Sequence, residues 1–398
     1  MPLPTLFLKP GREKSLLRRH PWIFSGAVAS VRGEPGSGET VAVRSSGGDF
    51  LAWAAYSPHS QIRARVWTWD EGETVDEVFF RSRLMQAIAA RQELVSPEVS
   101  NAVRLVYAES DGVPGLVADR YADTLVVQFL SAGAERWRGV LVHLLLELSG
   151  ADRLYEHSDV DVRRLEGLPE AAGQLAGLEF TDPIEISEHG LRFLVDVRAG
   201  HKTGYYLDQR RNRLVVRGFA SGRDVLDCFC YSGGFTINAL AGEARSVLSV
   251  DSSGEALANL RANLALNNLP NDRAEQMEAD VFQALRLFRD QGRSFDLIIL
   301  DPPKFAHTAS HAERAARGYK DINLLAFKLL RPGGILATFS CSGGVSEDLF
   351  QKIVAGAALD AGVDAQIIQR LHQDADHPVA LNFPEGAYLK GLVIKIRG

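Results

Sequence analysis

The sequence predicts an α/β protein with three domains: a small β-barrel, a small central α+β domain, and a larger domain with a mostly parallel sheet. The chain has 398 residues, which is too long for one ordinary domain. Its hydrophobic content of 46% and charged content of 24% are typical of a globular protein with a large core. The strand and helix patterns change near residues 72 and 182, so we expect domains at 1–72, 73–182 and 183–398.

Residues 1–72 contain short strands separated by turns rich in Gly and Ser. Strands are expected at Leu6–Leu8, Thr40–Val43 and Ile62–Trp67, the last with apolar and polar residues in alternation. A short helix is expected at Glu13–Arg19. Small strands joined by turns of this kind predict a compact barrel.

Residues 73–182 mix helical and extended patterns. Apolar residues recur near the helical period from Thr74 to Ala90, and a second helix is expected at Glu135–Leu148. Strands are expected at Arg104–Tyr107, Leu116–Asp119 and Leu125–Phe129. The Gly- and Ala-containing segment Leu168–Gly177 is interpreted as a turn or linker.

Residues 183–398 show apolar strands that alternate with helices. The strands are expected at Asp224–Asp227, Ser246–Asp251, Phe295–Leu300 and Ile335–Ser340, with helices at Ser253–Leu266 and Asp321–Leu330. This alternation predicts a mostly parallel sheet with helices on both faces. Ligands bind at the carboxyl ends of the strands in such sheets.

A nucleoside site without a phosphate cradle is predicted at these strand ends. The strand that ends at Asp227 runs into a glycine turn that lacks the Gly-x-Gly-x-x-Gly spacing of a pyrophosphate site, which argues against NAD. Asp251 is placed to bind ribose, and Asp280 with Val281 to bind adenine, although Asp251 also suits a helix cap. S-adenosylmethionine fits this description. The residues expected to bind it are Asp227, Phe229, Tyr231, Gly233, Asp251, Ser252, Asp280 and Val281.

A thiol and a carboxylate follow two further strands. Cys341 ends one strand, and Asp301 opens the motif Asp-Pro-Pro-Lys-Phe after the other. A thiolate that adds to carbon 6 of a pyrimidine makes carbon 5 nucleophilic, and Asp301 is placed to hold the ring. We therefore expect Cys341 and Asp301 to be catalytic. The alternative for Cys341 is a buried, inert thiol.

The net charge of −6 gives no general attraction to nucleic acid, so any RNA contact depends on a local basic face. Such a face is predicted in the first domain, close to Trp22 and Phe24. The candidate RNA-binding residues are Lys9, Arg12, Lys14, Arg18, Arg19, Arg63 and Arg65, with Lys304 beside the Pro-Pro turn. The alternative is a solvated basic helix.

The composition argues against membrane, secreted and metal-binding classes. No apolar run approaches the length of a membrane span, and Met1–Thr5 does not begin a secretory signal. Three cysteines suit a reducing cytoplasm, where we expect the protein. Cys228-Phe229-Cys230 lacks the spacing of a zinc site, and no metal is expected.

Three long strings, Gly11–Trp22, Gly200–Arg210 and Phe339–Gly343, carry a resemblance that runs essentially from end to end. The chain resembles the bacterial 23S ribosomal RNA large-subunit cytosine-5 methyltransferases of the RlmI type. The resemblance implies a PUA RNA-binding domain, a central domain and a Rossmann-like S-adenosylmethionine-dependent methyltransferase domain. It implies that Cys341 is the nucleophile, that Asp301 also lines the cofactor pocket, and that Tyr205 and Gln209 contact the cofactor.

The implied substrate is 23S ribosomal RNA or a large-subunit precursor; a homodimer is neither predicted nor excluded. Many RNA cytosine-5 methyltransferases carry a second cysteine after the Asp-Pro-Pro motif, where this chain has Lys304, so the base that removes the carbon-5 proton is unidentified. Two alternatives remain open. One is methylation of a base nitrogen without a thiol, and the other is an RNA-binding assembly factor without catalysis.

Overall fold

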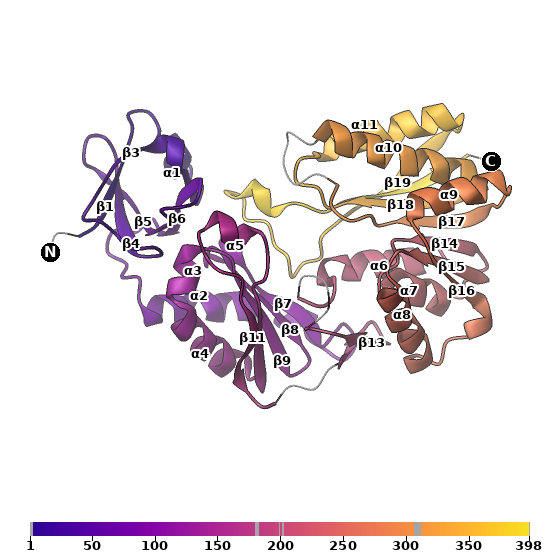
Figure 1. The fold of residues 1–398 in the computed structure, drawn as a ribbon, viewed down its shortest axis with the longest axis horizontal. Coiled ribbons are helices and arrows are strands. Elements are labelled where there is room, and N and C mark those ends of the chain that lie inside the picture. The colour runs from indigo at the N-terminus through magenta and orange to yellow at the C-terminus, as the bar shows by residue number, and fades with distance from the viewer. Residues whose placement is uncertain (1–2, 180–182, 199, 201–202, 306–311, 398) are drawn as a thin grey trace. The chain divides into compact units, whose positions relative to one another are not determined.

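The computed structural model describes residues 3–179, 183–198, 200, 203–305 and 312–397 (Figure 1). They form two compact units. The first unit comprises Met1–Ser187, Val195–Leu207 and Ala375–Gly386, and the second comprises Glu188–Leu194, Asp208–Asp374 and Ala387–Gly398. The excursion of Ala375–Gly386 into the first unit was not predicted from the sequence.

The first unit begins with a six-stranded sheet of order β2-β6-β5-β4-β1-β3. Its strands are β1 (Thr5–Leu8), β2 (Trp22–Phe24), β3 (Val28–Arg32), β4 (Thr40–Arg44), β5 (Phe50–Tyr56) and β6 (Ile62–Thr68), and helix α1 (Lys14–Leu17) follows β1. Alternating side chains such as Leu6 and Leu8 on β1 and Val41 and Val43 on β4 are fully buried and form its core. The expected strands are confirmed, whereas β2, β3 and β5 were not predicted.

A five-stranded sheet of order β11-β10-β9-β8-β7 follows. Its strands are β7 (Ala102–Tyr107), β8 (Leu116–Tyr121), β9 (Thr124–Phe129), β10 (Arg153–His157) and β11 (Ala172–Gly177), and its helices are α2 (Glu77–Ala89), α3 (Ala132–Arg136), α4 (Arg138–Ser149) and α5 (Val162–Leu165). The interpretation of Leu168–Gly177 as a linker is wrong, because Ala172–Gly177 pairs antiparallel with β10. As an edge strand, β11 is stabilised by its backbone hydrogen bonds with β10. Its Gly- and Ala-rich composition therefore does not identify it as a strand in the sequence.

Two further segments complete the first unit. The hairpin β12 (Ile184–Glu188) and β13 (Leu191–Val195) forms a two-stranded sheet; its two ends belong to the first unit, and Glu188–Leu194 between them belongs to the second. The segment Ala375–Gly386 is held by buried donors: Arg91 Nη2 donates to the Asp376 carbonyl at 3.2 Å, and the Arg104 amide donates to Asp376 Oδ2 at 3.0 Å. These bonds fix a stretch whose regular structure is confined to a 3-10 turn at Pro384–Gly386, so most of its backbone needs partners from elsewhere.

The second unit contains a seven-stranded sheet of order β16-β15-β14-β17-β18-β20-β19. Its strands are β14 (Asp224–Cys228), β15 (Ser246–Asp251), β16 (Ala274–Glu278), β17 (Phe295–Leu300), β18 (Leu330–Ser340), β19 (Ala365–His372) and β20 (Lys390–Ile396). Neighbours from β16 to β18 pair in parallel, and β20 is antiparallel to β18 and β19. The prediction of a mostly parallel sheet is confirmed.

Helices cover both faces of this sheet, as predicted. They are α6 (Arg210–Arg217), α7 (Gly234–Ala241), α8 (Gly254–Leu266), α9 (Val281–Asp290), α10 (Ala312–Leu329) and α11 (Glu347–Ala361). Figure 1 shows α9, α10 and α11 on one face and α6, α7 and α8 on the other. The sheet grows from β14 through β15 to β16 and then resumes on the other side of β14 with β17. This reversal of strand order is where α/β sheets bind ligands.

Candidate active site

The carboxyl ends of four parallel strands meet at one edge of the seven-stranded sheet. Cys228 pairs with both Val250 and Leu300, and Leu300 pairs with Thr338, so these strands end almost level. The acids predicted from the sequence lie at these ends: Asp227 is the penultimate residue of β14, Asp251 ends β15, and Asp301 follows β17. Cys341 follows β18 directly.

Asp227 is the most perturbed group at this edge. Its side chain is 1% exposed, and its Oδ2 accepts a 2.7 Å hydrogen bond from the Thr236 hydroxyl, which also lies 2.7 Å from Ser249 Oγ. Its Oδ1 is buried and has no hydrogen-bond partner among the described residues. Burial raises the pKa of Asp227 to about 7, and the charges of Asp301 and Asp251 act in the same direction. An acid in this state favours a ligand that brings a donor or a positive charge.

The turn after β14 has a strained backbone. Phe229, Tyr231 and Gly233 have φ angles of 62°, 48° and 86°, a region that bulky residues rarely occupy. A Cβ on Gly233 would lie 2.1 Å from Leu260 Cδ1, so only glycine fits there. Strain of this kind persists where the surrounding structure enforces it, and it clusters at ligand sites. Sequence reasoning identified all three residues as candidate cofactor contacts, but not the backbone strain at Phe229 and Tyr231.

Asp251 supports this turn. Its Oδ2 accepts from the Tyr231 amide and its Oδ1 from the Ser253 amide, both at 2.9 Å. Ser253, rather than Asp251, caps helix α8 by accepting from the Ala256 amide. Ser252 between them is exposed.

The predicted adenine pair has clear structural roles. Asp280 is exposed and caps helix α9, since its Oδ1 accepts from the Gln283 amide at 3.0 Å. Val281 is 3% exposed and belongs to the core of the second unit. Their roles in binding a cofactor stay predictions.

The thiol of Cys341 is half-buried, in contrast to the other two cysteines. Cys228 and Cys230 are buried, and burial raises both pKa values well above the usual range, so both remain protonated thiols at neutral pH. Only Cys341 among the three is placed at the strand edge with access to solvent. The alternative of a Cys341 sealed in the core does not fit the structure.

A tyrosine from α10 braces the two loops that carry Asp301 and Cys341. The Tyr319 ring lies 4.8 Å from that of Phe305, and its buried hydroxyl lies 3.0 Å from Ser342 Oγ. Tyr319, Thr236 and Lys390, which contacts the turn after Cys341, were not predicted. For Lys390, the one indication in the local sequence was a charged residue at the start of the apolar strand β20.

Tyr205 and Gln209 are both buried but belong to different units. The Tyr205 amide and carbonyl both bond the Tyr121 hydroxyl, at 3.3 and 3.2 Å. Gln209 Oε1 accepts from Asn212 Nδ2 at 2.6 Å. His201 and Lys202, part of the string that carried the resemblance, lie outside the described residues.

The predicted basic face is partly wrong. Lys9, Arg12, Lys14, Arg18, Arg19 and Lys304 are exposed. Arg63 is half-buried and donates to the Pro58 carbonyl. Arg65 is 6% exposed and forms ion pairs with Glu166 at 2.9 Å and Glu109 at 3.5 Å. Its charge is therefore neutralised inside the first unit, and the prediction that Arg65 faces RNA is wrong.

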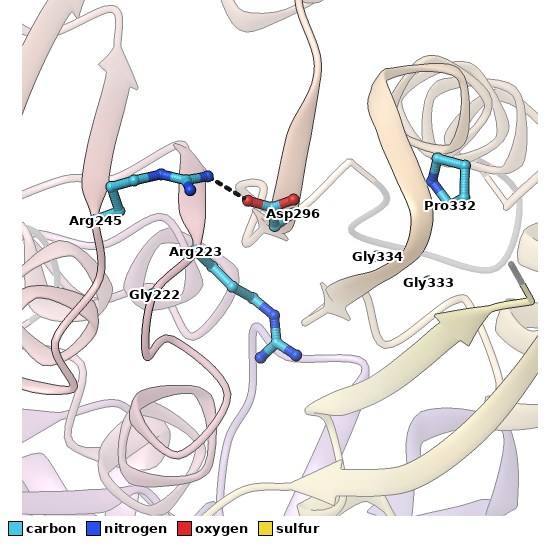
Figure 2. A pocket seen from close by; sticks show the side chains of 7 residues that line it. All are labelled: Gly222, Arg223, Arg245, Asp296, Pro332, Gly333 and Gly334. Carbon is cyan, nitrogen blue, oxygen red and sulfur yellow. Dashed lines mark hydrogen bonds and ion pairs between the residues drawn. The ribbon is translucent and has the colours of Figure 1, made fainter.

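A shallow pocket lies at the opposite edge of the seven-stranded sheet, at the amino ends of the strands. Its lining residues are Gly222, Arg223, Arg245, Asp296, Pro332, Gly333 and Gly334 (Figure 2). Arg245 and Arg331 both bridge Asp224 and Asp296 at 2.7–3.1 Å, so the charges there are paired. The pocket is remote from the acids at the carboxyl ends.

Two classes of site are not found in the part of the chain that the structure describes. No helix there combines the length and apolar character needed to cross a bilayer. No group of three or more His, Cys, Asp or Glu side chains there is arranged to hold a metal ion.

Family models match both ends of the chain. Residues 159–392 match the model described as S-adenosylmethionine-dependent methyltransferase, and residues 6–69 match a PUA-like domain. The fold class and the cofactor predicted from the sequence are thereby confirmed.

Curated relatives match over nearly the whole chain. A protein named ribosomal RNA large subunit methyltransferase I from Shewanella amazonensis is 53% identical over 98% of both chains. Its namesake from Klebsiella pneumoniae strain 342 is 51% identical over 99% of this chain and 98% of its own. Among solved structures, an S-adenosylmethionine-dependent methyltransferase from Streptococcus mutans covers 98% of this chain and 99% of its own with a TM-score of 0.85 at 20% identity, which shows the same fold.

Proposed function

Because the chain belongs to the ribosomal RNA large subunit methyltransferase I family, we infer that it transfers a methyl group from S-adenosylmethionine to large-subunit ribosomal RNA. We further propose that the acceptor is carbon 5 of a cytosine in 23S ribosomal RNA, and that Cys341 forms a transient covalent adduct with that base. The observation that carries this proposal is the half-buried thiol of Cys341 at the same sheet edge as Asp227 and Asp301.

The residues at the sheet edge fit the cofactor. When bound, S-adenosylmethionine supplies an electrophilic methyl group. We propose that the unpartnered Oδ1 of Asp227 accepts from its amino group and that Asp251 binds its ribose. The remaining proposed contacts are Tyr205, Phe229, Gln209, Tyr231, Gly233, Ser252, Asp280, Val281 and Asp301.

Cys341 and Asp301 would perform the chemistry on the base. The thiolate adds to carbon 6, and the electron pair of the carbon 5–carbon 6 double bond moves towards carbon 5, which can then take up the methyl group. Asp301 holds the ring by accepting from its amino group or, when protonated, by donating to N3. Loss of the carbon-5 proton restores the double bond and expels the thiolate of Cys341.

RNA binding is proposed for the first unit. Lys9, Arg12, Lys14, Arg18 and Arg19 are exposed and can contact phosphates, and the half-buried Arg63 is a further proposed contact. Lys304, in the second unit, is exposed and is proposed to contact RNA as well. Arg65 is left out because its charge is paired. We keep 1–72, 73–182 and 183–398 as the proposed RNA-binding, central and methyltransferase domains, in a protein proposed to act in the cytoplasm.

The test is mass-spectrometric mapping of methylated nucleosides in 23S ribosomal RNA from cells with the protein, without it, and with Cys341→Ala. The proposal expects one 5-methylcytosine that disappears in the last two. Cys230→Ala is the matched control, because it removes a buried thiol, and it should keep the modification. A methylated base nitrogen that persists in Cys341→Ala would refute the proposal and support the mechanism without a thiol.

A further inference from the structure

One lysine lies buried beside the proposed nucleophile. Lys390 begins strand β20, where it pairs with Ser340 of β18, one residue before Cys341. The residue is 9% exposed. Burying an ammonium group costs free energy unless the group is paired or hydrogen-bonded, so a specific role for its charge is expected.

The ammonium group is held by the turn that follows the thiol. Lys390 Nζ donates to the carbonyls of Ser342 and Val345, both at 2.8 Å. The same turn is closed by the Val345 amide, which donates to the Ser342 carbonyl at 3.1 Å. Lys390 therefore ties the backbone after Cys341 to the strand beneath it. Among the described residues Lys390 makes no ion pair with a carboxylate, so its charge is not neutralised locally.

The charges around Lys390 come from three neighbouring elements. Burial lowers its pKa to about 8, and the Cys341 thiolate opposes this shift, while Lys304 lowers the pKa and Glu347 of α11 raises it. Most Lys390 side chains therefore carry a charge at pH 7. Tyr319 of α10 and Asp301 are the other titratable groups at this corner, since Tyr319 senses the charges of both Cys341 and Asp301. Electrostatic effects are mutual, so a cation favoured by the thiolate also favours the thiolate.

We propose that Lys390 is a positioning residue for Cys341: it holds the Cys341–Val345 turn in place and stabilises the thiolate with its charge. This inference rests on the proposed function, since it matters for catalysis only if Cys341 is the nucleophile. The geometry does not favour Lys390 as the base that removes the carbon-5 proton, because its Nζ is buried and donates to two carbonyls of the protein.

The test measures the rate at which iodoacetamide alkylates Cys341 in the full chain between pH 5.5 and 9.5, followed by mass spectrometry of its peptide. Lys390→Met should move the midpoint up by about one pH unit, which lowers the rate at pH 7 about tenfold. Lys390→Arg keeps the charge and should stay near the wild-type midpoint. Lys395→Met, on the exposed face of the same strand, is the matched control and should change nothing.

Methylation and cofactor binding separate the outcomes. Each variant should bind S-adenosylmethionine as the wild type does. If Lys390→Met does not, Lys390→Gln is used in its place. Methylation by Lys390→Met should recover as the pH rises to 9, which a damaged fold would not allow. A midpoint within 0.3 units of wild type, with Cys341→Ala inactive, overturns the role of Lys390 alone. If Cys341→Ala still methylates, the proposed function fails and the role of Lys390 in catalysis fails with it.

Discussion

Replacing Asp227 by Asn should stabilise the protein without cofactor while it weakens cofactor binding. Asp227 is buried, and its Oδ1 has no partner among the described residues. Asn keeps the shape and an oxygen that can accept from Thr236, but it carries no charge. The buried carboxylate of Asp227 therefore lowers the free energy of unfolding, and only a bound ligand can offset this loss.

The magnitude follows from the pKa of Asp227, which is about 7 in the folded protein against an ordinary value of 3.8. Below about pH 4 the acid is protonated in both the folded and unfolded states, and it has no effect on stability. Between pH 4 and 7 the unfolded state ionises while the folded state stays protonated, so stability falls as the pH rises. Above pH 7 the loss is constant at roughly 3 pKa units, or about 4 kcal/mol. The amide group of Asn would lack a partner at a cost of about 1–3 kcal/mol, which leaves a net gain of about 1–3 kcal/mol at pH 8.

The assay is thermal unfolding of the full chain at pH 5, 6, 7 and 8, using the transition that S-adenosylmethionine shifts in the wild type. The advantage of Asp227→Asn should grow from pH 5 to pH 7 and then level off. Calorimetry at pH 8 should show cofactor affinity reduced about 10- to 100-fold, since a charge-assisted hydrogen bond is lost. A stability difference that does not depend on pH, or unchanged affinity, would refute the reasoning.

Three further predictions test other parts of the structure. Asp224, at the opposite end of the same strand, has its pKa held well below the usual range by Arg245. Asp224→Asn should therefore lower the free energy of unfolding at pH 7 by about 1 kcal/mol, as for a partly exposed pair, and lose this effect as the pH falls below 4. Arg65→Met leaves Glu166 buried without its ion pair and should destabilise the first unit by about 3–5 kcal/mol in chemical unfolding. Arg18→Gln should weaken RNA binding in filter assays and reduce the slope of log affinity against log salt by about one, with no change in unfolding temperature.

The sequence predicts the central strands of the parallel sheet well because they are buried on both faces, whereas the exposed or half-buried edge strand β16 was not predicted. Phe295–Leu300 is almost continuously apolar and gives a strong local pattern. The first sheet is harder, since β3 is mostly exposed or half-buried and lacks such a pattern. The edge strand β11 is recognisable only through its pairing with β10, a contact that no local composition reveals.

The same contrast applies to the site. Acids at strand ends can be located from the sequence, because a strand end fixes where its last residue lies. The partners of the residues at the site cannot be located from the sequence, because they come from distant parts of the chain. Lys390, for example, contacts Ser342 from 48 positions away. Arg65 is a second example. Its alternation with Arg63 correctly indicates a strand, but its side chain is buried because it pairs with Glu166, 101 residues later in the chain.

The acids at the two edges of the seven-stranded sheet differ in whether their carboxylates are paired with cations. At the amino ends, Asp224 and Asp296 share the guanidinium groups of Arg245 and Arg331, so that edge needs no ligand. At the carboxyl ends, neither Asp227 nor Asp251 forms an ion pair with Arg or Lys among the described residues, and Asp227 retains an unpartnered oxygen. A buried acid with an unpartnered oxygen destabilises a fold, so the persistence of Asp227 at this edge is best explained by a donor-rich, cationic ligand that binds there. S-adenosylmethionine has both properties, and it would bring its methyl group to the edge where Cys341 lies.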